Sequence, residues 1–261
     1  MRTIDINCDL GESFGNWSMG NDELVIPEIT SANVACGFHA SDPLTMIATV
    51  RRCHEHGVAI GAHPGLPDLL GFGRRPMGIS PDDAYAYILY QAGALQGIVG
   101  TVGEAIHHIK PHGAMYSILR TNQELAAAAA QAIVDFSPDV MVYWPAPISA
   151  ALPTEARERG IRVVGEIYPD LDYAADGSLI PQRAKHETDV DKAYRKVRLW
   201  LKEGSVEALD GSRIELEAES ICIHGDGPNA LDVVRAVKRA VTDAGCQVAV
   251  PGDARVTAVH P

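Results

Sequence analysis

Four histidines stand at similar places in the sequence, each at the end of a different short apolar run: His39, His63, His112 and His224. Imidazole exchanges a proton near neutral pH and binds transition metals, so it serves both acid–base and metal chemistry. A lone buried histidine is usually a hydrogen-bonded core residue. Four at equivalent places favour a shared site, because the carboxyl ends of parallel strands meet at one edge of a sheet or barrel.

Carboxylates gather at the first apolar run. Asp5, Asn7 and Asp9 alternate with apolar residues and so share one face of an expected strand. Asp9 and Glu12 follow its end, with Gly11 between them, where a turn can direct both side chains into a site as candidate general bases. Two simpler interpretations stay open: Asp5 accepts hydrogen bonds from a neighbouring strand or loop, and Glu12 caps the next helix.

Cations occur in two further motifs. Lys110-Pro-His-Gly places a permanent charge beside the His112 imidazole. Gly71-Phe-Gly-Arg-Arg is typical of an anion-binding lid, in which Arg74 or Arg75 offers bidentate donors; the alternative is an exposed loop with solvated arginines. The last motif, His224-Gly-Asp-Gly, opens a helix whose N–H groups can hold an anion, unless Asp226 is the N-cap.

Apolar runs that alternate with helical patterns supply the framework for these motifs. We expect strands over residues 3–9, 30–37, 58–63, 105–110, 139–144, 162–167 and 220–224. Helices are expected over residues 43–56, 81–99, 122–136, 147–159, 189–203 and 228–244, with Pro43, Pro81, Pro147 and Pro228 in their first turns. The long connections over residues 64–76 and 168–188 are candidate substrate-covering loops.

Seven such strands allow a closed barrel or an open doubly wound sheet. The turn after the first strand reads Asp9-Leu-Gly-Glu-Ser-Phe-Gly and lacks the glycine pattern of a dinucleotide site. Polar motifs end at least five of the strands, as they do around the mouth of a barrel. We therefore predict an α/β fold, a TIM-like (β/α) barrel with a polar lumen, as one domain over residues 1–261.

Composition limits the partners. The 261 residues carry 22 basic and 34 acidic side chains, a net charge of −12, with no basic run, which excludes nucleic acid and anionic membranes. No apolar stretch approaches the ~20 residues that span a bilayer, and no secretory signal is recognisable. Five cysteines without a Cys-x-x-Cys pair fit reduced thiols, with Cys8, Cys36 and Cys222 as small buried residues. We expect a cytoplasmic protein.

Six blocks along the chain have a recognisable order: Asn7-Cys-Asp-Leu-Gly-Glu-Ser-Phe-Gly, Ser31-Ala-Asn-Val-Ala-Cys-Gly-Phe-His, Gly61-Ala-His-Pro, Gly71-Phe-Gly-Arg-Arg, Lys110-Pro-His-Gly-Ala-Met-Tyr and His224-Gly-Asp. Together they resemble the signatures of the LamB/YcsF family of lactam-utilisation proteins. The resemblance implies an irregular seven-stranded β/α barrel of the glycoside hydrolase/deacetylase type. It also implies ATP-dependent opening of 5-oxo-L-proline to L-glutamate, carried out with two partner subunits, B and C, of a 5-oxoprolinase.

Residue type and placement suggest roles for this reaction. We hypothesise that Asp9 or Glu12 is the base that activates water, that His112 donates a proton to the leaving nitrogen, and that Lys110 holds phosphate or carboxylate with an arginine. The residues expected to bind substrate or phosphate are Asn7, Asn33, His39, His63, Arg74, Arg75, Asp170, Tyr173, Arg183, His224 and Asp226. ATP with Mg²⁺ is the expected co-substrate, and no tightly bound metal is expected.

Two other functions stay open. A metal-dependent amidohydrolase or deacetylase would bind zinc through Asp9, His39, His63 or His112 and use no ATP, although these histidines are scattered over several strands. A non-catalytic lactam-binding subunit of the same assembly is the other possibility.

Several positions depart from the family pattern, among them Gly65-Leu66, which replaces a common Ser-Tyr pair. Leu171 and Gln182 stand where arginine is usual, and Ser41 stands where glycine is usual. The loss of two cations beside an anion site leaves the identity of the lactam open.

Overall fold

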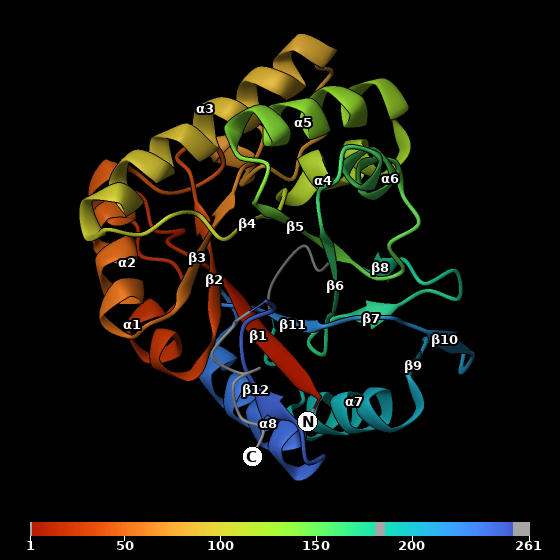
Figure 1. Cartoon of the computed structure of the whole chain (residues 1–261). Coiled ribbons are helices and arrows are strands. Elements are labelled where there is room, and N and C mark those ends of the chain that lie inside the picture. The colour runs from red at the N-terminus through yellow and green to blue at the C-terminus, as the bar shows by residue number, and fades with distance from the viewer. Residues whose placement is uncertain (1, 181–185, 253–261) are drawn as a thin grey trace, which may run out of the picture.

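The computed structural model describes residues 2–180 and 186–252. At its centre, seven parallel strands close into a barrel with helices around the outside (Figure 1). The strands are β1 (Thr3–Leu10), β2 (Ser31–Ala35), β3 (Ala59–His63), β4 (His108–Ile109), β5 (Met141–Pro145), β6 (Val163–Ile167) and β11 (Ser220–His224). The barrel closes because β11 pairs with both β6 and β1, with Cys222 opposite Asn7. The predicted seven-stranded barrel is confirmed, although β2 and β4 are shorter than expected.

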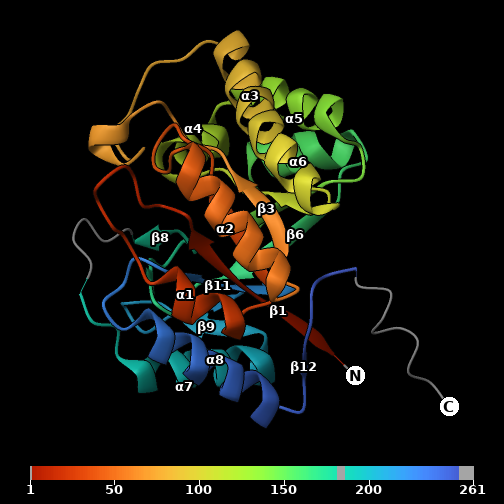
Figure 2. The same ribbon diagram turned by 90° about the vertical axis from the view of Figure 1, so that its left-hand side faces the viewer.

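The first strand shows how sequence alternation makes the lumen polar. Asp5, Asn7 and Asp9 bond to side chains of neighbouring strands, and all three are buried. Ile4 and Ile6, which point the other way, belong to the apolar core that the strands share with the surrounding helices. Figure 2 shows β1 running from the N-terminus toward the side where β8 lies, and this is the side at which the parallel strands end.

The six expected helices are present as α2 (Pro43–Glu55), α3 (Pro81–Val99), α5 (Gln123–Phe136), α6 (Ala151–Glu158), α7 (Val190–Glu203) and α8 (Ala230–Asp243). Proline occupies the first turn of α2 and α3, where Asp42 and Ser80 cap the free N–H groups. The prediction was wrong for Pro147 and Pro228, because α6 and α8 begin later. The hydrophobic repeat extends into the preceding loops, so it could not locate these starts.

Shorter elements complete the fold. Helices α1 (Asp22–Val25) and α4 (Gly113–Thr121) were not expected, nor were the 3₁₀ turns η1 (Ile26–Glu28), η2 (Leu69–Gly71) and η3 (Gly100–Val102). Two antiparallel pairs, β7 (Asp172–Tyr173) with β8 (Leu179–Ile180) and β9 (Ser205–Glu207) with β10 (Arg213–Glu215), lie outside the barrel sheet, and β12 (Gln247–Val248) adds to the start of β1. Among the helices described, none is long and apolar enough to cross a bilayer.

Candidate functional site

A buried ion pair lies at the carboxyl end of the barrel. The Lys110 ammonium is 2.9 Å from Asp9 Oδ1, 3.6 Å from Glu166 Oε1 and 2.8 Å from Cys222 Sγ. Lys110 comes from the segment after β4, Asp9 and Cys222 from the paired strands β1 and β11, and Glu166 from β6. Closure of the barrel therefore brings three distant parts of the chain to one ammonium group. Lys110 is only 4% exposed, so its charge is directed at these partners and away from solvent.

The charges of this pair are fixed by their mutual attraction. Burial alone would raise the pKa of Asp9, but the Lys110 ammonium, followed by His63, holds it well below its usual range. Burial would lower the pKa of Lys110, yet Asp9, Cys222 and Glu166 raise it well above its usual value. Burial raises the pKa of the Cys222 thiol. Asp9 is thus a carboxylate, Lys110 is an ammonium, and Cys222 is a neutral thiol at neutral pH.

A network of amides beneath the ion pair fixes Asp9. Asn33 Nδ2 donates to Asp9 Oδ1 and to Asn7 Oδ1, both at 2.7 Å, and Asn7 Nδ2 donates to Glu166 at 2.9 Å. His108 Nε2 is 2.6 Å from Asn33 Oδ1 and donates to it. Both asparagines are completely buried, which places them under the mouth as supports for Asp9.

Asp5 lies deepest in the lumen. Its carboxylate accepts hydrogen bonds from Thr30, Ser31 and Ser220 at 2.6–2.7 Å. These three hydroxyls replace the water that Asp5 loses on burial. The structural interpretation of this residue is confirmed.

Three imidazoles and one carboxylate form a second buried cluster beside Asp9. Ligand atoms from Glu12, His39, His63 and His112 all lie within 4.8 Å of one another. The His39 ring stacks on His112 with centroids 3.8 Å apart, and His63 Nε2 is 3.5 Å from Asp9 Oδ2. Burial lowers the pKa of His39 and of His112, so both rings are neutral at neutral pH. The expected shared histidine site is therefore present for three of its four members.

Glu12 has no role as a helix cap. The next helix, α1, starts after Asn21, and Glu12 instead belongs to the histidine cluster. Burial raises the pKa of Glu12 well above its usual value, and the charges of Asp9 and Asp226 raise it further. The donor set of Glu12 and three histidines is one that could hold a metal ion, and it contains Glu12 in place of the Asp9 named in the zinc hypothesis.

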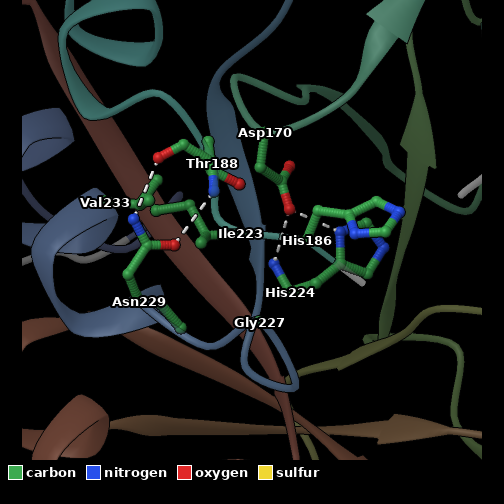
Figure 3. A pocket seen from close by; sticks show the side chains of 9 residues that line it. Asp170, His186, Thr188, Ile223, His224, Gly227, Asn229 and Val233 are labelled. Atoms are coloured by element: carbon green, nitrogen blue, oxygen red, sulfur yellow. Dashed lines mark hydrogen bonds and ion pairs between the residues drawn. The ribbon is translucent and has the colours of Figure 1, made fainter. Parts of the chain in front are cut away.

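The fourth histidine forms a dyad with an acid from the loop after β6. Asp170 Oδ2 accepts hydrogen bonds from the backbone N–H of His224 at 3.2 Å and from its Nδ1 at 2.7 Å (Figure 3). Because a carboxylate only accepts, Nδ1 of His224 carries a proton in this hydrogen bond. Nε2 lies 3.9 Å from Asp9 Oδ2, so the dyad is directed at the ion pair.

The dyad borders a small pocket at the start of α8. Thr188 and Asn229 line its other side, and His186 lies beside His224 (Figure 3). Asn229 exchanges two hydrogen bonds with the Thr188 backbone, at 3.0 and 2.9 Å, and thereby ties this loop to α8. Asn229, not Asp226, is the N-cap residue of α8.

The two arginines of the glycine-rich loop have different surroundings. Arg74 is 3.9 Å from Asp226 Oδ2, and its guanidinium lies 5.0 Å from the centre of the Phe72 ring. Its side chain is one-third exposed, at the edge of the histidine cluster. Arg75 instead binds Asp68 within the same loop and is mostly exposed. Arg74 is thus the arginine that borders the site, while Arg75 stabilises the loop.

The remaining predicted site residues and the positions that depart from the family pattern have different surroundings. Tyr173 is completely buried, and its hydroxyl oxygen accepts the Tyr168 N–H at 2.8 Å, so it fixes the loop and does not face the mouth. Arg183 and Gln182 lie outside the described residues. Leu171, where arginine was expected, is buried in the apolar core. Ser41 has φ 75°, which explains why glycine is usual at this position.

Four residues that contact the site were not assigned from the sequence. Glu166 offered a usable signal, because it is the one acid in the expected strand over residues 162–167 and is flanked there by Gly165 and Ile167. Cys222 shares strand parity with His224, yet it was predicted to be only a small buried residue; it is buried and also contacts Lys110. His108 has the same parity as Lys110 in the expected strand over residues 105–110. Tyr168, whose hydroxyl donates to Glu166 at 2.6 Å, offered no signal in the sequence.

Comparison with known proteins places this chain in a family. The model of the LamB/YcsF family matches residues 4–255. The 5-oxoprolinase A subunit of Bordetella pertussis is 46% identical over 247 residues, covering 94% of this chain and 97% of that protein. The protein of the same name from Bacillus cereus is 44% identical over 253 residues, covering 96% and 100%.

A solved structure gives the same result. The lactam utilization protein from Thermus thermophilus matches with a TM-score of 0.87 and 42% identity, over 95% of this chain and 99% of that one. By its family match, its relatives and its fold, the chain belongs to the LamB/YcsF family.

Proposed function

We propose that this protein is the A subunit of a 5-oxoprolinase with subunits B and C. The reaction couples the opening of 5-oxo-L-proline to L-glutamate to the hydrolysis of ATP. Relatives of about 45% identity over nearly the whole chain carry the name of the 5-oxoprolinase A subunit. The structural observation that carries the proposal is one carboxylate, Asp9, fixed by Lys110 on one oxygen and facing the Asp170-oriented His224 with the other.

The chemistry explains why ATP is required. A five-membered lactam resists water because amide resonance weakens its carbonyl as an electrophile. Transfer of a phosphoryl group to the lactam oxygen gives an imidate-like carbon that water can attack. The resulting tetrahedral carbon must then break its bond to nitrogen, because loss of phosphate from it would only regenerate the lactam. A proton delivered to the ring nitrogen decides between these outcomes. Ring opening gives an acyl phosphate, and a second water releases glutamate and phosphate.

The mouth of the barrel supplies the two proton-transfer groups. Asp9 Oδ2 accepts a proton from the attacking water, while Lys110 and Asn33 hold Oδ1 in place. His224 Nε2, 3.9 Å from Asp9 Oδ2, takes up the proton that Asp9 has accepted and delivers it to the ring nitrogen, while Asp170 holds Nδ1–H. Arg74 at the rim binds the phosphate or the substrate carboxylate.

These assignments change two roles that residue type had suggested. Lys110 is enclosed by Asp9, Glu166 and Cys222, so we assign it to positioning the base and not to binding an anion. Both ring nitrogens of His112 already face other groups, the carbonyl of Phe72 and the His63 ring, so the donor role passes to His224.

The wider reaction follows from the same proposal. ATP with Mg²⁺ is the co-substrate, subunits B and C are the partners, and the reaction takes place in the cytoplasm. The five free cysteines, four of them buried, support a reducing compartment.

The test measures glutamate and ADP released from 5-oxo-L-proline by the purified chain, alone and mixed with subunits B and C. We expect ATP-dependent glutamate only from the mixture, and little from a mixture containing His224→Gln. ATP-independent hydrolysis by the chain alone would establish the amidohydrolase instead. Lactam binding without turnover in an assembled mixture would indicate a binding subunit.

A further inference from the structure

The hydrogen bonds of two buried histidines leave two lone pairs facing each other. His63 Nδ1 lies 2.6 Å from the carbonyl oxygen of Lys110, and His112 Nε2 lies 2.8 Å from the carbonyl oxygen of Phe72. A carbonyl oxygen can only accept, so each of these nitrogens carries a proton, and in a ring with a single proton it is the only nitrogen that does. The remaining nitrogens, His63 Nε2 and His112 Nδ1, therefore both present lone pairs, yet they are 3.0 Å apart.

Two lone pairs at this distance repel unless a cation lies between or beside them. The arrangement is also the one that metal-binding histidines usually have, since the ring nitrogen that does not bind the metal donates to a backbone carbonyl or carboxylate. That second bond fixes both the tautomer and the direction of the free lone pair. Both His63 and His112 meet this condition through a backbone carbonyl.

A third histidine supplies an independent observation. His39 is 1% exposed, and neither of its ring nitrogens has a hydrogen-bond partner among the described residues. Burying an unpaired ring nitrogen is unfavourable, so such a side chain indicates a ligand. Gly65 provides the space for this ring, because a Cβ there would lie 2.4 Å from His39 Nδ1.

One carboxylate completes the donor set. Glu12 is 6% exposed and offers an oxygen within 4.8 Å of the three histidine nitrogens. Around one ion at a ligand distance of about 2.1 Å, donor atoms lie at most about 4.2 Å apart, so small side-chain movements suffice. His39, now stacked on His112, would turn to bring one nitrogen to the ion. A proton shared between His63 Nε2 and His112 Nδ1 would satisfy only these two nitrogens, whereas four ligand atoms converge at this site.

We propose that Glu12, His39, His63 and His112 form a binding site for one divalent transition-metal ion of the zinc type. Three imidazoles and a single carboxylate favour borderline ions such as Zn²⁺ and Co²⁺ over Mg²⁺ or Ca²⁺, which prefer oxygen ligands. This inference replaces the sequence-based expectation of a site without metal. It does not depend on the lactam reaction, because metal binding is measured without turnover.

The test uses the full-length protein after treatment with a chelator, with Zn²⁺ and Co²⁺ as the probes. Calorimetry is expected to show one Zn²⁺ per chain, with no competition from millimolar Mg²⁺. Co²⁺ is expected to give visible absorption bands of a nitrogen- and oxygen-ligated ion. Glu12→Gln and His39→Gln should each weaken Zn²⁺ binding by about 100-fold or more, beyond the roughly 10–100-fold typical of changes to residues that only support a ligand.

The matched control is the double variant His54→Gln with His56→Gln, which removes two exposed histidines of the α2 region and should bind Zn²⁺ as the unaltered protein does. Circular dichroism checks that each variant is folded, and ¹⁵N NMR of the histidine rings provides a readout in the unaltered protein. The proposal is overturned if the folded, stripped protein binds no Zn²⁺, or if neither variant changes the affinity. It is also overturned if NMR with Zn²⁺ present shows a proton shared between His63 and His112.

Discussion

Replacement of Asp9 by asparagine tests the ion pair on which the site is built. The change keeps the shape of the side chain and removes its charge. At an effective dielectric constant of about 20, attraction to Lys110 at 2.9 Å is worth about 6 kcal/mol, and attraction of Lys110 to Glu166 at 3.6 Å about 5 kcal/mol. The variant loses the first and keeps the second, and it also avoids the cost of burying the Asp9 charge. Loss of one partner from a buried pair typically costs about 3–5 kcal/mol, and Glu166 places the expected loss near the lower end.

Urea unfolding followed by circular dichroism at neutral pH measures this loss. We expect Asp9→Asn to lower the free energy of unfolding by about 3 kcal/mol, a fall in Tm of roughly 6–10 °C for a chain of this size. Asp139→Asn removes an exposed charge and serves as the matched control, with an expected effect within about 0.5 kcal/mol.

A double-mutant cycle with Lys110→Met gives the decisive comparison. Without the ammonium, Asp9 and Glu166 are buried carboxylates that have both lost the cation between them. In that background Asp9→Asn should be neutral or stabilising, which reverses its sign. An equal cost in both backgrounds would refute the argument, since it would show that Asp9 and Lys110 are not energetically coupled.

Three further changes test other parts of the structure. Asp170→Asn should reduce ATP-dependent glutamate release by the three-subunit mixture about 10- to 100-fold, because it weakens the orientation of the His224 imidazole. The control Asp172→Asn, which changes a half-buried neighbour paired with Lys192, should not reduce it, and equal rates for the two variants would remove the dyad from the mechanism. Gly61→Ala would put a Cβ 2.1 Å from the His108 ring, so the free energy of unfolding, measured by thermal unfolding, should fall by about 1–3 kcal/mol. An unchanged Tm would contradict this close packing. Burial lowers the pKa of Lys196 to about 8, so between pH 8 and 10 the unfolded state binds the proton that the folded state has released. The free energy of unfolding should therefore rise with pH in that window. Urea unfolding of Lys196→Met should lack this rise, and parallel pH profiles for the variant and the unaltered protein would count against the argument.

The sequence predicted the architecture because each barrel strand carries its own local evidence. The apolar runs that became β1, β3, β5, β6 and β11 are flanked by turn residues, and the helices between them have a strong 3.6-residue repeat. The starts of α6 and α8 were misplaced because their proline residues lie in loops ahead of the first helical turn. Helix α4 was missed because it follows directly on the Lys110-Pro-His-Gly motif, which was interpreted as a turn.

The candidate site was predictable in its membership and not in its pairings. Strand parity put Asp9, Lys110 and His224 on the lumen side, and strand ends put the histidines at one mouth. The sequence does not indicate which of these residues pair with one another. Only the barrel register sets Lys110 against Asp9 and Cys222, and only the loop after β6 brings Asp170 to His224.

The sequence by itself thus determined the polar lumen, the number of strands and the family, since alternation and ordered motifs are local properties of the chain. The tertiary structure decided which charges are paired, which histidine tautomers are possible and which arginine borders the mouth. These depend on distances between residues up to 215 positions apart, as for Ser220 and Asp5. Electrostatic energies and hydrogen-bond directions change steeply over a few ångströms, and the distances between these side chains are set only when the barrel closes.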